Sequence, residues 1–394
     1  MKYCILIIDG AAGWPLPGKG GKTCLELAHT PNLDALAKEA TAGLVRNVPE
    51  GMEPSSAHAC TSLLGYDPRV YHPGRAAIEA RSMGIPIEDG EALFRCNLVS
   101  IDGGVMRDYS AGHIPTAEAK ELVAALEKHL GNWVISFYPG ISYRHICKIR
   151  GHEDTLKALC TPPHDIPNQA IEAYLPRGTG SEFLRDLMVR SVPLLRDHPV
   201  NKARRARGEV PATMIWLFWG SGYAPDMPPF RQVYGLVPAI TAGVDVLRGL
   251  AQMVGMEVLD IPGVTDGLDN DFAGQAEGAL KALADHDLAV IHVEAADEAG
   301  HSGLIDEKIE AIEIVDREIV GRLRRWQKDK LRVLVAPDHP TPIEVQTHVP
   351  DPVPFLLWGP GFRANGAGRF TEAEARRTNL LIDPGYNIIK RLVG

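Results

Sequence analysis

The sequence Tyr-Cys-Ile-Leu-Ile-Ile-Asp-Gly occupies residues 3–10 and gives the clearest indication of the fold. A short apolar run of this kind predicts a strand buried on both faces of a sheet, and Asp9 follows where the run ends. Similar runs at Leu288–Val293 and Arg332–Ala336 are also followed by acidic and histidine residues. Proteins with α/β sheets place their ligands beyond the carboxyl ends of the strands, so we expect these polar side chains to meet at one edge of a sheet.

The polar residues near these strand ends have the chemistry of metal ligands. They are Asp9, Asp297, His301, Asp338, His339 and His348. Singly, each has an ordinary explanation as a helix pair, a cap, a turn former or a loop histidine. Together, their carboxylate and imidazole donors can hold two divalent metal ions. Such donors accept Mn²⁺ and Zn²⁺, the ions we expect, as well as Mg²⁺ and Co²⁺.

Pro54-Ser55-Ser56 opens a predicted helix that runs to about Leu64 and stops at Gly65. Serine at such a position is often a simple N-cap. Ser56 also has the features of a nucleophile, because a helix N-terminus suits a phosphate and a nearby metal ion would lower the pKa of the hydroxyl. The sequence does not separate Ser55 from Ser56 in this role.

Strands alternate with helices in both flanking parts of the chain, which predicts a mainly parallel sheet with helices on both faces. Thr30 is a candidate N-cap with Pro31 in the first turn. Further strands are predicted at 43–48, Glu257–Ile261 and Val353–Trp358, and a long helix at Asp306–Lys328.

The middle of the chain differs from its flanks. It is punctuated by proline and glycine, and it contains predicted strands such as Trp133–Phe137 and His145–Ile149 among some helices. We therefore expect a discontinuous core domain of residues 1–70 and 240–394, interrupted by an inserted α+β domain of residues 71–239.

Composition limits the classes of partner. The 394 residues carry 41 basic and 50 acidic side chains, a formal net charge of −9, which argues against a nucleic-acid or membrane-surface binder. The most basic stretch, 202–207, has the pattern of a solvated helix face. The six cysteines form no CxxC pair and no signal peptide is visible, so we expect a cytoplasmic protein with reduced thiols. The sequence sets no oligomeric state.

The order of motifs along the whole chain resembles the archaeal-type 2,3-bisphosphoglycerate-independent (cofactor-independent) phosphoglycerate mutases of the alkaline phosphatase superfamily. The motifs that carry the resemblance are Asp9-Gly10, Thr30-Pro31-Asn32-Leu33-Asp34, Pro54-Ser55-Ser56, Ser62-Leu63-Leu64-Gly65-Tyr66-Asp67-Pro68, Gly74-Arg75, Phe94-Arg95-Cys96-Asn97-Leu98, Pro163-His164-Asp165, Asp297-x-x-x-His301, Asp338-His339-Pro340-Thr341-Pro342 and His348.

The resemblance implies an alkaline-phosphatase-like core and a phosphoserine enzyme that interconverts 3-phosphoglycerate and 2-phosphoglycerate in glycolysis and gluconeogenesis. Ser56 would be the nucleophile and would bind one metal ion with Asp9, Asp338 and His339. Asp297, His301 and His348 would bind the other. Asp108 and Arg95 would act in catalysis, with Asp108 as general acid and base. The small phosphorylated carboxylic acid would be bound by Arg75, Arg95, Asn97, Arg144 and Arg204.

The chain departs from the family pattern at four positions, Ala57, Cys60, His113 and Gln275. These are expected to contact substrate or phosphate, which predicts weaker mutase activity with some release of free phosphate. Two alternatives stay open: a phosphohydrolase or phosphotransferase acting on another small phosphorylated or phosphonylated acid, and a non-catalytic paralogue that binds a metabolite.

Overall fold

The computed structural model describes residues 1–71, 74–222, 227–326 and 330–394. The chain divides into two compact units, of which unit 1 is Met1–His72 with Asp226–Gly394 and unit 2 is Pro73–Pro225. The domain boundary expected near residue 240 lies inside a strand of unit 1, β8 (Pro238–Thr241). Within the described residues, no helix combines the length and the apolar character needed to cross a membrane.

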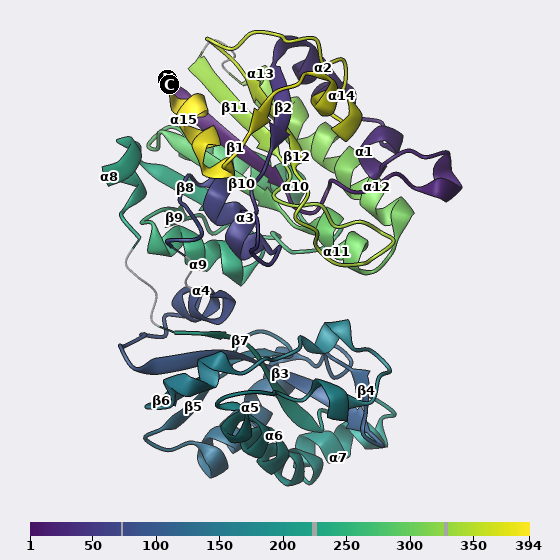
Figure 1. The fold of residues 1–394 in the computed structure, drawn as a ribbon, viewed down its shortest axis with the longest axis vertical. Helices are drawn as coiled ribbons and strands as arrows, with labels where there is room; N and C mark the ends of the chain where they lie inside the picture. The colour runs from purple at the N-terminus through teal and green to yellow at the C-terminus, as the bar shows by residue number, and fades with distance from the viewer. Residues whose placement is uncertain (72–73, 223–226, 327–329) are drawn as a thin grey trace. The chain divides into compact units, whose positions relative to one another are not determined.

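Unit 1 is built on one sheet of eight described strands (Figure 1). Their order across the sheet is β13 (Leu381–Ile382), β2 (Thr41–Val45), β12 (Val353–Trp358), β11 (Leu331–Ala336), β1 (Lys2–Ile8), β10 (Leu288–Val293), β8, β9 (Glu257–Val258). Only β12 runs antiparallel to its neighbours β11 and β2. The mainly parallel sheet expected from the sequence is confirmed.

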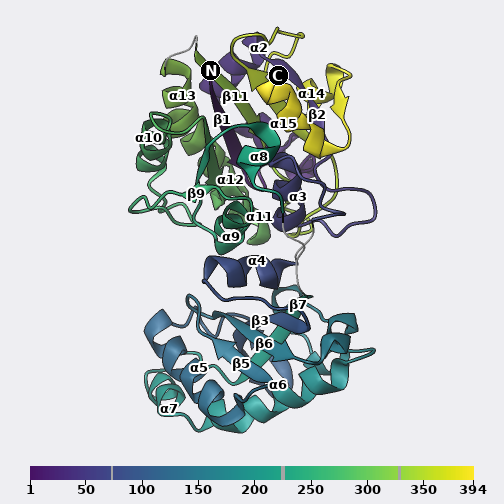
Figure 2. The ribbon, with the colours of Figure 1, turned by 90° about the vertical axis from the view of Figure 1, so that its left-hand side faces the viewer.

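Helices cover both faces of this sheet, which explains why β1 can be apolar along its whole length. Figure 2 shows α10, α12 and α13 on one face and α3 and α15 on the other. The described helices of unit 1 are α1 (Cys24–Leu27), α2 (Pro31–Glu39), α3 (Ser56–Leu63), α8 (Phe230–Tyr234), α9 (Asp245–Met253), α10 (Phe272–Ala282), α11 (Ala295–His301), α12 (Ile305–Ile314), α13 (Gly321–Arg325), α14 (Glu372–Arg377) and α15 (Ile388–Val393).

The helix predicted at Asp306–Lys328 is present over residues 305–325, but it is not α-helical throughout. Between α12 and α13 the chain forms a π-helical segment, Val315–Val320, and residues 327 and 328 lie outside the described residues. Asp316 in this segment accepts hydrogen bonds from the backbone N–H groups of Asn32 and Leu33. This carboxylate, and not the hydroxyl of Thr30, caps the N-terminus of α2, because Thr30 makes no capping hydrogen bond.

Unit 2 is an α+β unit with an antiparallel sheet. Its described elements are α4 (Arg75–Ser82), β3 (Glu91–Asp102), β4 (Val105–Asp108), α5 (Thr116–Leu130), β5 (Ile135–Tyr138), β6 (Arg144–Arg150), α6 (Ser181–Arg196), α7 (Pro199–Ala206) and β7 (Met214–Ser221). The long strand β3 pairs with β4, β6 and β7.

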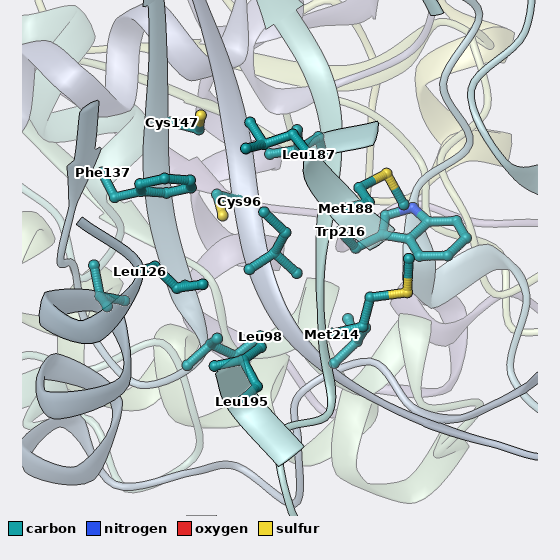
Figure 3. Packing of buried hydrophobic residues seen from close by; sticks show 14 of the residues in the cluster. Cys96, Leu98, Leu126, Phe137, Cys147, Leu187, Met188, Leu195, Met214 and Trp216 are labelled. Carbon is teal, nitrogen blue, oxygen red and sulfur yellow. The ribbon is translucent and has the colours of Figure 1, made fainter. Parts of the chain in front are cut away.

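The core of unit 2 lies between this sheet and helices α5 and α6. Figure 3 shows Cys96 and Leu98 of β3 packed with Trp216 of β7 and with Leu126 and Leu187 from the helices. Since side chains alternate along a strand, the residues between these core positions, Arg95 and Asn97, face the other side of the sheet.

Candidate active site

Three parallel strands bring their polar residues to one edge of the unit 1 sheet. β1 lies between β10 and β11 and is parallel to both, so the three carboxyl ends meet. Asp9 follows β1, and its backbone N–H donates to the carbonyl of Val293 at the end of β10. Asp338 follows β11 at the same edge. The structure therefore brings Asp9 and Asp338 to the same edge of the sheet.

The first donor group consists of Asp9, Asp338 and His339, which are all buried. The Nε2 atom of His339 lies 3.1 Å from Asp338 Oδ2 and 3.7 Å from Asp9 Oδ1. Asp338 Oδ1 accepts hydrogen bonds from the N–H groups of Gly10 and His339, at 3.2 and 2.7 Å, which fixes the carboxylate. Asp9 Oδ1 is buried and has no hydrogen-bond partner among the described residues. A buried carboxylate oxygen of this kind is suited to a cation.

The second donor group consists of Asp297 and His301 on α11 and His348 in the loop after β11. The two imidazole Nε2 atoms face each other at 2.8 Å, and they lie 3.2 Å (His301) and 3.6 Å (His348) from Asp297 Oδ2. The Nδ1 atoms contact the carbonyls of Gln346 (2.9 Å) and Pro54 (3.3 Å). If each Nδ1 carries the proton, both Nε2 lone pairs point with the carboxylate towards one place, as in a metal site.

The charges of these groups are strongly coupled. Burial raises the pKa of Asp9, and the neighbouring carboxylates of Asp338 and Glu294 raise it further. Burial also raises the pKa of Asp338 to about 6. Burial opposes the protonation of His301, but the charge of Asp297 outweighs it and raises the pKa to about 9. A site that concentrates buried carboxylates attracts cations, and the donor sets of both groups fit divalent metal ions.

Gly10 allows the two donor groups to lie close together. Its φ is +61°, and a Cβ atom there would lie 2.4 Å from Asp297 Oδ1. Only glycine adopts this backbone conformation readily and leaves room for the carboxylate. The sequence places Gly10 directly after Asp9, but it does not reveal the approach of Asp297.

Thr341 and Lys308 support the ligand loops. The hydroxyl of Thr341 hydrogen-bonds Asp297 and lies 3.4 Å from Nδ1 of His339, so it contacts one ligand of each donor group. The buried ammonium of Lys308 donates to the carbonyls of Ala12 and Thr341 at 3.1 and 2.7 Å. These contacts join the loop after β1 to the loop after β11.

The structure distinguishes the two serines before α3. Ser55 is the N-cap, and its hydroxyl accepts from the N–H of His58 and lies 2.9 Å from the His58 ring. Ser56 is the first residue of the helix, and its hydroxyl lies 3.2 Å from Nε2 of His339. Ser56 therefore lies next to the first donor group, whereas the Ser55 hydroxyl caps the N-terminus of α3.

Unit 2 gathers arginines on the face of its sheet opposite the core. Arg75 and Arg95 both donate to the buried carboxylate of Glu79, and Arg75 stacks on Trp219 with 4.2 Å to the ring centroid. Asn97 lies directly across from Arg144 in the β3–β6 pair. Guanidinium groups bind carboxylates and phosphates through paired hydrogen bonds, so this face of unit 2 is suited to an anion.

Two further residues expected at the site make local contacts. Arg204 is buried in α7, where its guanidinium donates to the carbonyls of Val210 and Ala111 and to Glu118. These bonds give Arg204 a structural role that the sequence did not reveal, because Glu118 lies far away along the chain. Asp108 ends β4 and accepts hydrogen bonds from the N–H and hydroxyl of Ser110.

The four positions that depart from the family pattern have different surroundings. Gln275 is fully buried in α10, where it donates to the carbonyl of His292 and accepts from Asn270, so the expectation of a substrate contact there is wrong. Ala57 and Cys60 are buried in α3, and the Cys60 thiol lies 3.6 Å from Asp338 Oδ2. His113 is an exposed residue of unit 2 with φ +46°.

Two further residues, His292 and Glu294, were not expected at the site and lie beside Asp9. His292 Nε2 lies 2.7 Å from Asp9 Oδ2 and 3.5 Å from Glu294 Oε2, and the three residues form a third buried donor group. His292 lies in β10, and Glu294 follows the strand as the N-cap of α11, three residues before Asp297. Their place at the carboxyl end of a buried strand was the signal that could have found them.

Comparisons with known proteins agree on one family. A family model described as 2,3-bisphosphoglycerate-independent phosphoglycerate mutase matches residues 37–201. A protein with this name from Methanothrix thermoacetophila is 45% identical over 396 residues, covering 100% of both chains. A protein named as a probable enzyme of the same kind from Geobacter sulfurreducens is 40% identical over 400 residues, again covering 100% of both chains.

Solved structures show the same likeness. A protein from Pyrococcus horikoshii superposes with a TM-score of 0.82 at 26% identity, covering 99% of this chain and 96% of the other. A cofactor-independent phosphoglycerate mutase from Thermoplasma acidophilum superposes with a TM-score of 0.63 at 25% identity, covering 100% and 99%.

Proposed function

Since the chain belongs to the family of 2,3-bisphosphoglycerate-independent phosphoglycerate mutases, we propose that it interconverts 3-phosphoglycerate and 2-phosphoglycerate through a phosphoserine on Ser56. The observation that carries this proposal is the contact between the Ser56 hydroxyl and Nε2 of His339, 3.2 Å apart, beside two groups of carboxylate and imidazole donors. A serine that only capped the helix would not need these neighbours.

Seven residues would hold two divalent metal ions. Asp9, Ser56, Asp338 and His339 would bind one ion, and Asp297, His301 and His348 would bind the other. When bound, the ions lower the pKa of the serine hydroxyl and offset the charge of the phosphoryl oxygens. The donors are nitrogen and oxygen only, which is compatible with Mn²⁺, Zn²⁺, Mg²⁺ or Co²⁺.

Ser56 would carry the phosphoryl group between the two hydroxyls of glycerate. Its Oγ forms a bond to phosphorus while the bond from phosphorus to the 3-hydroxyl oxygen breaks. Glycerate then reorients, and its 2-hydroxyl oxygen attacks the phosphoserine and releases Oγ. Ser56 is the first residue of α3, so the positive end of the helix dipole would add to the attraction for the phosphate.

Residues of unit 2 would bind and orient the acid. Arg75, Arg95 and Arg144, together with Asn97, would hold its anionic groups through charge-assisted hydrogen bonds. Asp108 would take up and return the proton of the glycerate hydroxyls as general acid and base. Arg204 is left out of this set because its guanidinium already bonds Glu118, Val210 and Ala111.

The test follows the position of phosphorus by NMR in the metal-loaded enzyme supplied with 3-phosphoglycerate. We expect 2-phosphoglycerate to appear, activity to be lost after chelation, and Ser56→Ala to bind metal ions without turnover. Ser55→Ala is the matched control and should still transfer phosphate. Release of inorganic phosphate without 2-phosphoglycerate would make the protein a hydrolase, and metal-loaded protein that converts neither isomer would refute an enzymatic role.

A further inference from the structure

Strand β7 of unit 2 carries one extra residue where it pairs with β3. Arg95 of β3 lies opposite Phe218. Two residues along β3, Leu93 lies opposite Ser221, which is three residues along β7, so the pair contains a β-bulge. Trp219 lies in the bulge with a φ of +47°, in the left-handed region that a bulky side chain rarely adopts. Strain of this kind persists only where the surrounding structure holds it, and it is concentrated at functional sites.

The bulge brings the indole of Trp219 to the side of the sheet that carries the arginines. In a regular strand, neighbouring side chains point to opposite faces. Here the rings of Phe218 and Trp219 lie 4.6 Å apart, and Cζ of Arg95 lies 5.8 Å from the first centroid and 5.9 Å from the second. The next residue is Gly220, where a Cβ atom would lie 2.6 Å from the ring of Phe94. The backbone of the bulge is therefore packed closely against β3.

The guanidinium of Arg75 is held from two directions. Its Cζ atom lies 4.2 Å from the centroid of the Trp219 ring, which covers one face of the planar group. Its Nε atom donates to Glu79 at 3.0 Å. Neither contact uses the two terminal nitrogens, and the Arg75 side chain is 23% exposed. The paired N–H groups at its end can therefore still bind a carboxylate or a phosphate.

The end of β7 also fixes the backbone just before Arg75. Gly74 has a φ of +77°, and a Cβ atom there would lie 2.1 Å from the hydroxyl oxygen of Ser221. The start of α4 thus lies directly against the strand that carries Trp219. Strand β7 sets the position of Arg75 twice, through the backbone at Gly74 and through the indole at the guanidinium.

From this arrangement we propose that Trp219 is a positioning residue, which holds the Arg75 guanidinium in the plane in which its paired N–H groups bind the anionic group of the substrate. The proposal rests on the proposed function, in which Arg75 binds the acid. Among aromatic side chains, the indole attracts a cation most strongly. An arginine that is already ordered loses less conformational freedom when the anion binds, so the substrate binds more tightly.

The competing explanation is that Trp219 only stabilises unit 2. Its ring also lies 5.4 Å from the ring of His164, so it packs against more than the arginine. In that case, loss of the indole would lower the melting temperature and the fraction of active enzyme. Apparent kcat would fall, but KM would not change, because the remaining folded molecules would bind substrate normally.

The experiment measures KM and kcat for 3-phosphoglycerate in the metal-loaded enzyme, with thermal melting followed by circular dichroism. Trp219→Leu should raise KM about 5- to 30-fold and change kcat by less than about twofold. Trp219→Phe keeps an aromatic face and should recover most of the loss in KM. Trp133→Leu is the matched control, because it removes a tryptophan of unit 2 that is 79% exposed, and it should behave like the unmodified enzyme.

The variant Arg75→Gln shows whether the indole acts through the arginine. Adding Trp219→Leu to Arg75→Gln should raise KM no further, and an equal rise in both backgrounds would overturn the proposal. An unchanged KM in Trp219→Leu would also overturn it and would leave the proposed function intact. Trp219→Met replaces Trp219→Leu if the latter does not fold. Absence of turnover in the unmodified enzyme would contradict the proposed function instead, and the same comparisons are then made on the Kd for 3-phosphoglycerate.

Discussion

The hydroxyl of Thr341 offers a sharp test of how the two donor groups are held. It hydrogen-bonds Asp297 and lies 3.4 Å from Nδ1 of His339, so one small group supports a ligand in each set. Thr341→Val keeps the shape of the side chain. It also keeps the backbone bonds of residue 341 to Ala12 and Lys308.

The expected loss follows from these two contacts. Removing a group that orients a metal ligand typically weakens metal binding about 10- to 100-fold. A 10- to 100-fold loss corresponds to about 1.4–2.7 kcal/mol of binding free energy. Because ligands of both groups are affected, we expect the upper part of this range, close to 100-fold, or about 2.7 kcal/mol.

The assay is calorimetric titration of the metal-free variant with Mn²⁺, with circular dichroism to confirm folding. Thr155→Val is the matched control, because Thr155 is a fully buried threonine of unit 2 whose hydroxyl donates to the carbonyl of His152. A folded Thr341→Val protein that binds Mn²⁺ within about threefold of the unmodified protein would show that this hydroxyl does not support the ligands.

Three further predictions concern single side chains. His339→Ala should lose one metal ion and nearly all turnover, because the ion supplies several kcal/mol of charge stabilisation; full metal content with normal turnover would contradict this. Glu79→Gln should raise KM for phosphoglycerate more than it lowers kcat, since the carboxylate that fixes Arg75 and Arg95 loses its charge; an unchanged KM would remove Glu79 from substrate binding. Burial lowers the pKa of His145 from 6.5 to about 3, so the free energy of unfolding should be fully retained above pH 6.5 and should fall by about 1.4 kcal/mol per unit as the pH drops towards 3; denaturant unfolding of His145→Gln should lack this part of the slope.

The central strands, and the aspartate and histidine residues that follow them, were predictable because they depend on local sequence. An apolar run such as that of β1 can be buried only as a central strand, and a carboxylate just beyond it lies at the ligand-binding edge. The edge strand β9 is shorter than the predicted Glu257–Ile261, and β2 begins and ends earlier than predicted. Strand ends are set by neighbouring strands, which the local sequence does not show.

The sequence-based predictions differed from the structure where residues distant in the sequence determine the local structure. The π-helical segment within the long helix keeps the apolar spacing of an α-helix, and its purpose is visible only in the contact of Asp316 with the start of α2. Arg204 has the charge of a substrate ligand but is committed to Glu118. Gln275 was expected to contact substrate, yet it packs behind β10.

The pairing of β1 has a consequence for folding during translation. Its partners β10 and β11 begin at residues 288 and 331, so β1 is synthesised long before the strands with which it pairs. Unit 2 is one continuous segment with its own core, and it can fold in the meantime. The apolar strand β1 therefore stays unpaired until β10 and β11 have been synthesised. We expect chaperones to bind this segment of the nascent chain, and truncated chains to aggregate through it.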